Sequence, residues 1–274
     1  MFNNKDKVKD TFNSAAKKFD EKGTPFFRYF GQLLAESAEI ISGMEILDIA
    51  CGKGATTFPL AERLNGNGKI YAIDISDSMI EECKQRLNKE KINNIEFSVM
   101  DIEKLEFEDD SMDLVVCGFG LFFLPDIEKG LKEIKRVLKK DGMLVFSSWN
   151  GEYRLDWMYD LLAKYVPGFK NNSVKNTGNM NVNDFNSISG LNKILNKTGF
   201  EKISISVHDL SCYYKNEEEW LETRWNTAFR MHLEMMDEDS YNNFVDDAFG
   251  FLQDYKQNGT IEILMSAFIT KAKK

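Results

Sequence analysis

Between residues 43 and 150, short runs rich in Val, Ile, Leu and Phe alternate with amphipathic stretches of helical spacing. Such alternation is typical of repeated β–α units, which form a parallel sheet covered by helices. The apolar runs lack strict alternation, as expected for strands buried on both faces, and comprise residues 44–50, 69–75, 95–101, 112–118 and 142–149. The pattern predicts an α/β fold whose ligand site lies at the carboxyl ends of the strands.

The stretch from 126 to 142 illustrates the helical spacing. Apolar residues recur at intervals of four, three and four, at Ile127, Leu131, Ile134 and Leu138. One stripe would therefore pack on the sheet while the lysines face water. Asp126 is predicted to cap the start of this helix and Gly142 to follow its end.

Outside this core the pattern is mainly helical. Two helical stretches, 217–235 and 237–255, interrupt a possible hairpin and are predicted to form a lid, and the polar segment 170–184 is predicted to be mobile. We expect five regions: an N-terminal helical lid at 1–42, the ligand-binding core at 43–150, helices and the sixth strand with a mobile linker at 151–210, an inserted helical cap at 211–258, and a final strand at 259–274.

The first strand leads into the loop sequence DIACGKG, in which Gly52 and Gly54 permit a tight turn and close approach of a ligand. A dinucleotide-binding loop would carry a third glycine where this chain has Thr57. Asp48, four residues before Gly52, would repel a pyrophosphate but suits a ligand with an ammonium group.

Two more acids follow the next strands. Asp74 lies 20 residues after Gly54, the spacing at which an acid binds ribose hydroxyls, and this fits either NAD or an adenosyl ligand. Asp101, followed by Ile102, can accept a hydrogen bond from an adenine amino group. Structural alternatives remain open: Asp74 and Asp101 as caps, the glycines as plain turn residues, and Met79 as core filler.

As an ordered set, LDIACGKG, AIDISDSMI, MDIEKL and MDLVVCGFGLFFLPD resemble the class I S-adenosylmethionine-dependent methyltransferases, over about residues 15 to 150. The resemblance implies a Rossmann-like doubly wound sheet of seven strands, mostly parallel, with an antiparallel last strand beside the fifth. It also implies S-adenosylmethionine as cofactor. Its contacts would be Gly52 and Gly54 beneath the methionine part, Asp48 and Ala50 at the amino group, Asp74 at the ribose, Ile75, Met79, Asp101 and Ile102 at the adenine, and Gly118 and Phe119 beside the methyl group.

Methyl transfer from a sulfonium needs alignment and exclusion of water more than unusual chemistry. The candidates for an acceptor pocket are aromatic: Phe27, Phe123, Trp149 and Trp225. Trp225, Phe229 and His232 are spaced to share one helical face, where His232 could act as a base, although a histidine beside aromatics is more often a packing residue.

The opening TFNSAAKKFDEKGTPFF also resembles quinone-biosynthesis methyltransferases, but Phe19 stands where they have a tyrosine. We therefore expect a different small-molecule acceptor, with the quinone C-methyltransferase as the alternative. Further alternatives are a protein methyltransferase, a dinucleotide oxidoreductase and a non-catalytic scaffold that binds the cofactor. The absence of an Asn/Asp-Pro-Pro-aromatic motif and a net charge of −9 argue against nucleic acid as a partner.

No run reaches the roughly 18 apolar residues of a membrane helix, and the polar start lacks a secretory segment, which predicts a cytoplasmic protein without membrane contact. The cysteines stand far apart and there are two histidines, a spacing that suits neither a metal site nor a disulfide framework. The sequence leaves the oligomeric state open.

Overall fold

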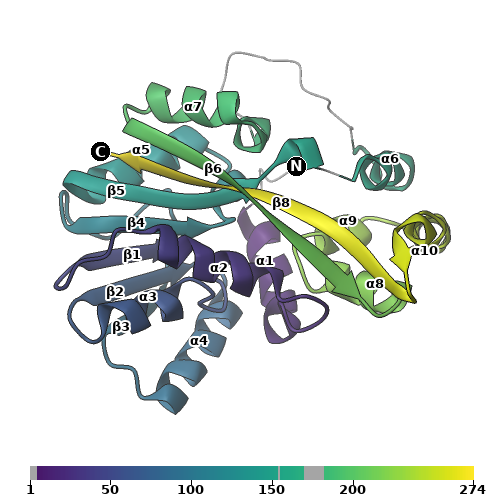
Figure 1. Ribbon diagram of the computed structural model, residues 1–274, viewed down its shortest axis with the longest axis horizontal. Helices are drawn as coiled ribbons and strands as arrows, with labels where there is room; N and C mark the ends of the chain where they lie inside the picture. The colour runs from purple at the N-terminus through teal and green to yellow at the C-terminus, as the bar shows by residue number, and fades with distance from the viewer. Residues whose placement is uncertain (1–4, 154, 170–181) are drawn as a thin grey trace.

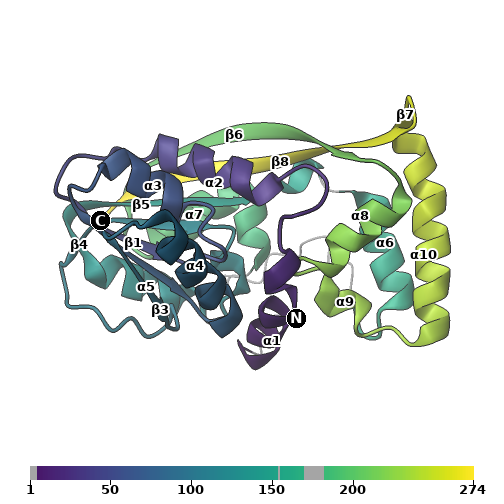
Figure 2. The same cartoon turned by 90° about the horizontal axis from the view of Figure 1, so that it is seen from below.

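The computed structural model describes residues 5–153, 155–169 and 182–274. Its sheet runs in the order β3-β2-β1-β4-β5-β8-β6 (Figure 1), and a short β7 pairs with β8 (Figure 2). The first five strands are parallel, and β8 runs antiparallel between β5 and β6. The expected α/β fold is confirmed. The sheet has one strand more than the seven expected, because β7 forms a short hairpin with β8. The strands are β1 (Glu45–Ile49), β2 (Lys69–Asp74), β3 (Ile95–Val99), β4 (Met112–Gly118), β5 (Leu138–Trp149), β6 (Glu201–Tyr214), β7 (Lys256–Gln257) and β8 (Thr260–Lys273).

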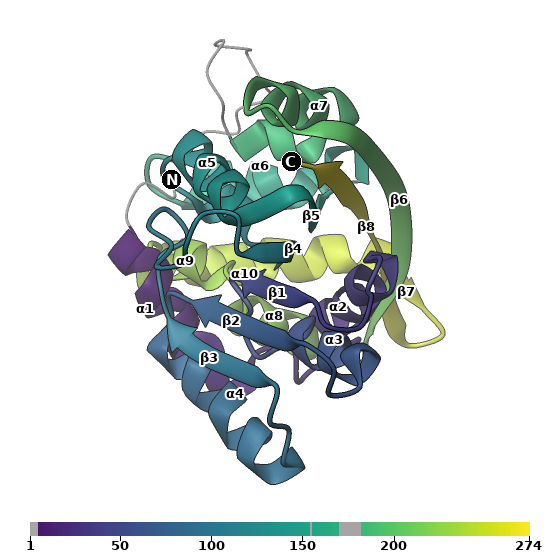
Figure 3. The same cartoon turned by 90° about the vertical axis from the view of Figure 1, so that its left-hand side faces the viewer.

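Helices cover both faces of the sheet. Viewed along the strands, α2 (Phe26–Ser37), α3 (Thr57–Leu64) and α4 (Asp77–Glu90) lie on one face, and α5 (Ile127–Val137) and α7 (Ile188–Lys197) on the other (Figure 3). The central strands are consequently rich in buried apolar residues: Ile46, Leu47 and Ile49 of β1 are fully buried. Asp48 breaks this pattern, because it is a carboxylate with no exposed surface in the same strand.

The helix expected from Asp126 to Gly142 is shorter than its apolar stripe suggests. Asp126 caps its start, accepting a hydrogen bond from Lys129 N at 2.9 Å, as predicted. The helix ends at Val137, however, and Leu138 already pairs with Met112 as the first residue of β5. Gly142 therefore lies inside a strand and does not terminate the helix. The pairing of β4 with β5 shifts register between Met112 and Leu114: Met112 pairs with Leu138, and Leu114 pairs with Met143. This irregularity accommodates the additional β5 residues between the two pairs, so β5 can begin directly after the helix.

The remaining helices are α1 (Lys5–Ala15), α6 (Asp156–Tyr165), α8 (Glu217–Trp225), α9 (Arg230–Leu233) and α10 (Glu238–Leu252). The helix expected over 217–235 is broken between α8 and α9. At the break, Thr227 Oγ1 lies 3.2 Å from Arg224 O and 3.4 Å from Phe229 N, local bonds that compete with a continuous helix. The prediction that Trp225, Phe229 and His232 share one helical face is therefore wrong.

The long strands β6 and β8 extend beyond the core and carry α8, α9 and α10, which gather beside α6 and close to α1 (Figure 2). The cap helices thus adjoin the N-terminal helix, which lies over α4. Of the predicted mobile linker 170–184, residues 170–181 lie outside the described residues, and 182–186 form a 3-10 turn. Within the described part of the chain, no helix has the length and apolarity needed to cross a membrane. The five regional boundaries stay predictions.

Candidate active site

The loop after β1 adopts a left-handed backbone at three positions: φ is +53° at Ala50, +53° at Gly52 and +77° at Gly54. A Cβ on Gly54 would lie 2.5 Å from the Phe58 ring, whereas a Cβ on Gly52 would meet nothing within 4 Å. The two glycines therefore differ in role. Gly54 allows loop and helix α3 to pack closely, and Gly52 leaves open space beside the backbone that a ligand can fill.

Asp48 lies in β1, just before this loop. One of its carboxylate oxygens is hydrogen-bonded, and the other has no partner among the described residues. Its Oδ2 accepts a hydrogen bond from Thr57 Oγ1 at 2.5 Å, and its Oδ1 has no partner among the described residues. Burial raises the pKa of Asp48 to about 7, opposed by the Thr57 hydrogen bond and assisted by the charge of Asp74. A buried carboxylate oxygen without a donor suits a ligand ammonium group. In the sequence, Thr57 stands only as a departure from the dinucleotide pattern, and no motif there indicates that it orients Asp48.

Asp74, at the end of β2, accepts two backbone hydrogen bonds, from Gly52 N and Ser76 N, both at 2.9 Å. It therefore links the glycine loop to the start of α4, where Ser76 caps the helix by accepting from Met79 N. Burial raises the pKa of Asp74, and these backbone bonds oppose the rise. Each carboxylate oxygen keeps a second lone pair, so the capping alternative and ribose binding are compatible.

Asp101, beyond β3, is engaged by an unexpected partner. Lys5 Nζ of α1 lies 2.6 Å from Asp101 Oδ2 and 2.7 Å from Glu103 Oε2, while Asp101 Oδ1 accepts from Glu103 N at 2.9 Å. Burial lowers the pKa of Lys5, but hydrogen bonds to the two acids outweigh this and raise it. Further along α1, Asn13 Oδ1 accepts from Ser76 Oγ at 2.6 Å. No motif in the sequence marked Lys5 or Asn13.

One cavity of about 1090 Å³ joins these groups to the cap. Its volume exceeds the roughly 300–1,000 Å³ usual for a single small-molecule site, so it has room for a cofactor and an acceptor. Among the predicted residues, Gly54 and Trp225 do not line it. Those that do are Asp48, Ala50, Gly52, Asp74, Ile75, Met79, Asp101, Ile102, Gly118, Phe119, Phe27, Phe123, Trp149 and His232.

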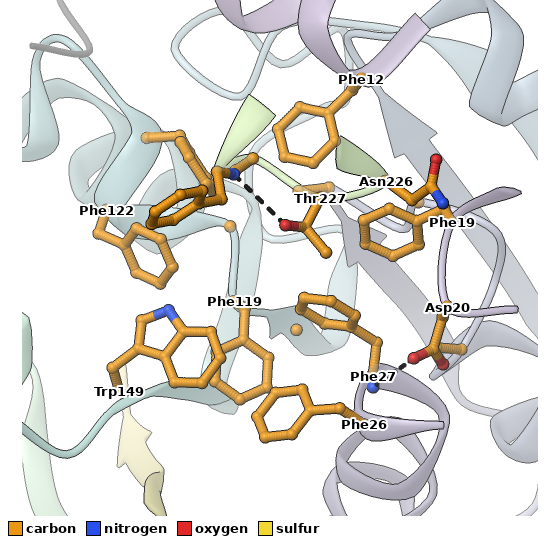
Figure 4. Close-up of a pocket in the computed structure, with 18 of the residues that line it drawn as sticks. Phe12, Phe19, Asp20, Phe26, Phe27, Phe119, Phe122, Trp149, Asn226 and Thr227 are labelled. Carbon is orange, nitrogen blue, oxygen red and sulfur yellow. Dashed lines mark hydrogen bonds between the residues drawn. The ribbon is translucent and has the colours of Figure 1, made fainter. Parts of the chain in front are cut away.

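Aromatic rings form one wall of the cavity (Figure 4). Phe26 stacks on Trp149 with ring centroids 4.9 Å apart, and Phe119 lies 4.8 Å from the same indole. Phe27 meets Phe119 edge to face and stacks on Phe19 at 4.7 Å. Phe119 itself has a left-handed backbone, with φ of +55°, at the end of β4. This wall favours a flat apolar ligand beside Phe119.

His232 and Trp225 lie apart, as the helix break requires. His232 borders the cavity between Phe169 and Phe229, each ring 5.5 Å away, and its Nδ1 has no partner in the described structure. Burial, followed by the charge of Lys7, lowers the pKa of His232 to about 4, so its imidazole is neutral near pH 7. Trp225 Nε1 instead donates to the Tyr241 hydroxyl at 3.0 Å, outside the large cavity.

Comparison with known proteins agrees with this geometry. The family described as a methyltransferase domain matches residues 40–222. This chain belongs to the methyltransferase domain family.

Two relatives of the family illustrate the extent of the match. The chain is 35% identical over 144 residues to the aklanonic acid methyltransferase DauC of Streptomyces sp. (strain C5), covering 53% of this chain and 66% of that protein. It is 36% identical over 146 residues to the demethylmenaquinone methyltransferase of Lactococcus lactis, covering 52% of this chain and 58% of that protein. The match thus spans less than two thirds of either relative.

A solved structure extends the likeness to the fold. The YcgJ protein of Bacillus subtilis aligns with a TM-score of 0.61 over 90% of this chain and 98% of its own, at 19% identity. The two chains therefore share their fold over most of their lengths.

Proposed function

We propose that this protein is an S-adenosylmethionine-dependent methyltransferase acting on a small-molecule acceptor. The observation that carries the proposal is the free oxygen of Asp48, buried in the same cavity as Asp74, Asp101 and the open space beside Gly52. An amino acid joined to a nucleoside presents an ammonium group, two ribose hydroxyls and an adenine amino group, which match these carboxylates. A pyrophosphate ligand would instead place negative charge beside Asp48.

The residues present fit this cofactor. Asp48 would hold its ammonium group, Gly52 its methionine part, Asp74 its ribose, and Asp101 with Ile102 and Met79 its adenine. When bound, S-adenosylmethionine supplies an electrophilic methyl group on a sulfonium.

The protein would contribute mainly by aligning the two reactants and by excluding water. Phe119 and Trp149 would hold a flat acceptor in line with the methyl group, and the lid of α1 and the cap helices would exclude water. Asp48 and the backbone of the glycine loop would hold the cofactor in place. His232, neutral near pH 7, lies at the cap side of the cavity, and a pKa of about 4 makes it a weak proton acceptor. We therefore propose a packing role for His232.

Relatives named as methyltransferases of aklanonic acid and of demethylmenaquinone support a small-molecule acceptor. The quinone alternative is not favoured, because Phe19, which stacks on Phe27, offers no hydroxyl at the position where quinone enzymes carry a tyrosine. The net charge of −9 speaks against nucleic acid as the acceptor.

Calorimetry with S-adenosylmethionine, S-adenosylhomocysteine and NAD tests the cofactor assignment. We expect binding of the two adenosyl compounds but not of NAD. Asp74→Asn should weaken S-adenosylhomocysteine at least tenfold, whereas Asp109→Asn, an exposed acid paired with Arg136 away from the cavity, should not. Binding of NAD alone would overturn the proposal.

Transfer itself needs a second experiment. Labelled S-adenosylmethionine is incubated with the protein and a protein-free extract of the source cells, and a labelled small molecule is expected. Cofactor binding without any labelled product would favour a non-catalytic scaffold.

A further inference from the structure

The end of α8 supplies a polar wall to the cavity. Thr223, Arg224, Asn226 and Thr227 all border it. Figure 4 shows Asn226 and Thr227 across the cavity from Trp149 and Phe119. An acceptor lying on the aromatic wall would therefore meet these polar groups on its other side.

Asn226 is buried, with 8% of its surface exposed, yet its Nδ2 has no hydrogen-bond partner in the described residues. A buried amide donor left unsatisfied costs about 1–3 kcal/mol. Asn226 borders both the large cavity and a second pocket beside Trp225 and Tyr241. In the large cavity, the partner of this amide would be an acceptor atom of a bound molecule. The atom must be an oxygen or nitrogen with a free lone pair.

Arg224 adds a positive charge to the same wall. Its Nη2 donates to the Tyr214 hydroxyl at 3.1 Å and to Thr223 Oγ1 at 3.2 Å, and the guanidinium lies 5.3 Å from the Trp220 ring. These contacts hold the group in place but leave Nη1 without a bond in the described structure. No carboxylate of the described residues lies within 4 Å of it.

No ion pair offsets the charge of Arg224 among the described residues. Of the acids that line the cavity, Asp20 accepts from Phe27 N at 3.2 Å and Arg28 N at 2.9 Å at the start of α2, and Glu21 pairs with Lys53 at 3.0 Å. By contrast, Arg230 in the same cap pairs with Glu234 at 2.6 Å and does not border the large cavity. A guanidinium fixed by neutral partners, in the same cavity lining as a buried amide donor, suits an anionic oxygen group.

We propose that Arg224 and Asn226 bind an anionic oxygen group, such as a carboxylate, on the methyl acceptor. The acceptor is then a flat apolar acid, a conclusion that deepens the proposed function and rests on it. The guanidinium withdraws charge from the oxygen it holds, which makes that oxygen a weaker nucleophile. The acidic group is therefore the anchor of the acceptor, and the methylated atom lies elsewhere on the ring system.

Two probes of equal shape test this proposal: 2-naphthoate, an acid, and 2-naphthamide, its neutral counterpart. Binding is measured by calorimetry with and without S-adenosylhomocysteine. The wild-type protein should bind 2-naphthoate at least tenfold more tightly than 2-naphthamide. Arg224→Gln should weaken the binding of 2-naphthoate at least tenfold and that of 2-naphthamide less than twofold. Asn226→Leu should change the two affinities in the same direction. Arg230→Gln is the matched control and should change neither.

Several results would overturn the proposal: equal binding of the two probes, no binding of either, or an equal loss of both in Arg224→Gln. If Arg224→Gln weakens the binding of S-adenosylhomocysteine and leaves the binding of 2-naphthoate unchanged, Arg224 would instead be assigned to the cofactor carboxylate. If Arg224→Gln does not fold, the wild-type protein still decides, since raising the salt concentration should weaken 2-naphthoate and not 2-naphthamide. The preference between the two probes is measured without methyl transfer. Failure of this proposal is therefore distinguishable from failure of the protein to bind or use the cofactor.

Discussion

Lys5 Nζ lies 2.6 Å from Asp101 Oδ2, so the first helix of the chain is joined to the carboxylate proposed to bind the adenine amino group. The same ammonium contacts Glu103, and Asn13 contacts Ser76 at the start of α4. Helix α1 is therefore held over the cofactor end of the cavity by polar contacts at both of its ends. An adenine amino group must share Asp101 with Lys5 or displace it.

Replacing Lys5 with Met should loosen α1 without unfolding the core. Lys5 is about one third exposed, so its two ion pairs together contribute about 1 kcal/mol, which is roughly fivefold in local opening. Hydrogen exchange of residues 5–15 should accelerate about fivefold, while exchange in β1 and β4 stays unchanged. Lys84→Met, an exposed lysine on α4, is the control. Unchanged exchange in α1 would show that the ion pairs do not hold the helix.

The two glycines of the loop should respond differently to alanine. Gly54→Ala would bring a Cβ to 2.5 Å from the buried Phe58 ring, and we expect a loss of about 1–3 kcal/mol of stability. Gly52→Ala meets no atom within 4 Å and costs about 1 kcal/mol for its left-handed backbone, a conformation that Ala50 already adopts nearby. Its methyl group should occupy cofactor space and weaken S-adenosylhomocysteine at least tenfold. Thermal unfolding and calorimetry measure both effects; full affinity in Gly52→Ala would remove this loop from the binding site.

The raised pKa of Asp48 predicts a pH-dependent stability. The folded protein without cofactor holds the proton to about pH 7, whereas an unfolded aspartate releases it near pH 3.8. The free energy of unfolding should therefore fall as the pH rises from about 4 to about 7. Asp48→Asn removes this ionisation, so above pH 7 it should be more stable than the wild type by more than about 1 kcal/mol. Denaturant titrations between pH 4 and 8 test the slope, and identical slopes in both proteins would contradict the assignment.

Cofactor binding should show the opposite trend at Asp48. An ammonium group favours the ionised carboxylate, so S-adenosylhomocysteine should bind more tightly as the pH rises through about 7. In Asp48→Asn this dependence should disappear and affinity at pH 8 should drop about tenfold or more. Calorimetry at pH 6, 7 and 8 measures both effects, with Asp109→Asn as a control acid outside the cavity.

His232 should stay neutral in mildly acidic solution. Its pKa is lowered to about 4 by burial, below the ordinary 6.5, so its protonation opposes folding and stability should fall as the pH drops from about 6.5 toward 4. Proton NMR of the imidazole signals tests this directly, because the chain has two histidines and His208→Gln and His232→Gln assign them. A midpoint near 6.5 for His232 would show that the ring is solvated and restore it as a candidate base.

Local pattern and spacing were enough to predict the core fold and to place three acids near one edge of its sheet. Asp48, Asp74 and Asp101 lie at or just beyond the carboxyl ends of strands that meet at one edge of a parallel sheet, so their convergence follows from topology. Spacing could not reveal where Trp225 points, because Asn226 and Thr227 break the helix after it. Gly142 was misread for a similar reason: pairing of Leu138 with Met112 ends the helix before its apolar stripe does.

The sequence by itself therefore determined the α/β sheet, the glycine turn and the order of the three acids, since these depend on periodicity and on residue types along the chain. Only the tertiary structure decided that Lys5 meets Asp101, that Thr57 orients Asp48, and that Asn226 and Thr227 lie across the cavity from the aromatic wall. Those contacts join residues brought together by packing, and no local pattern records which distant side chain will fill a given space or leave a buried donor without a partner.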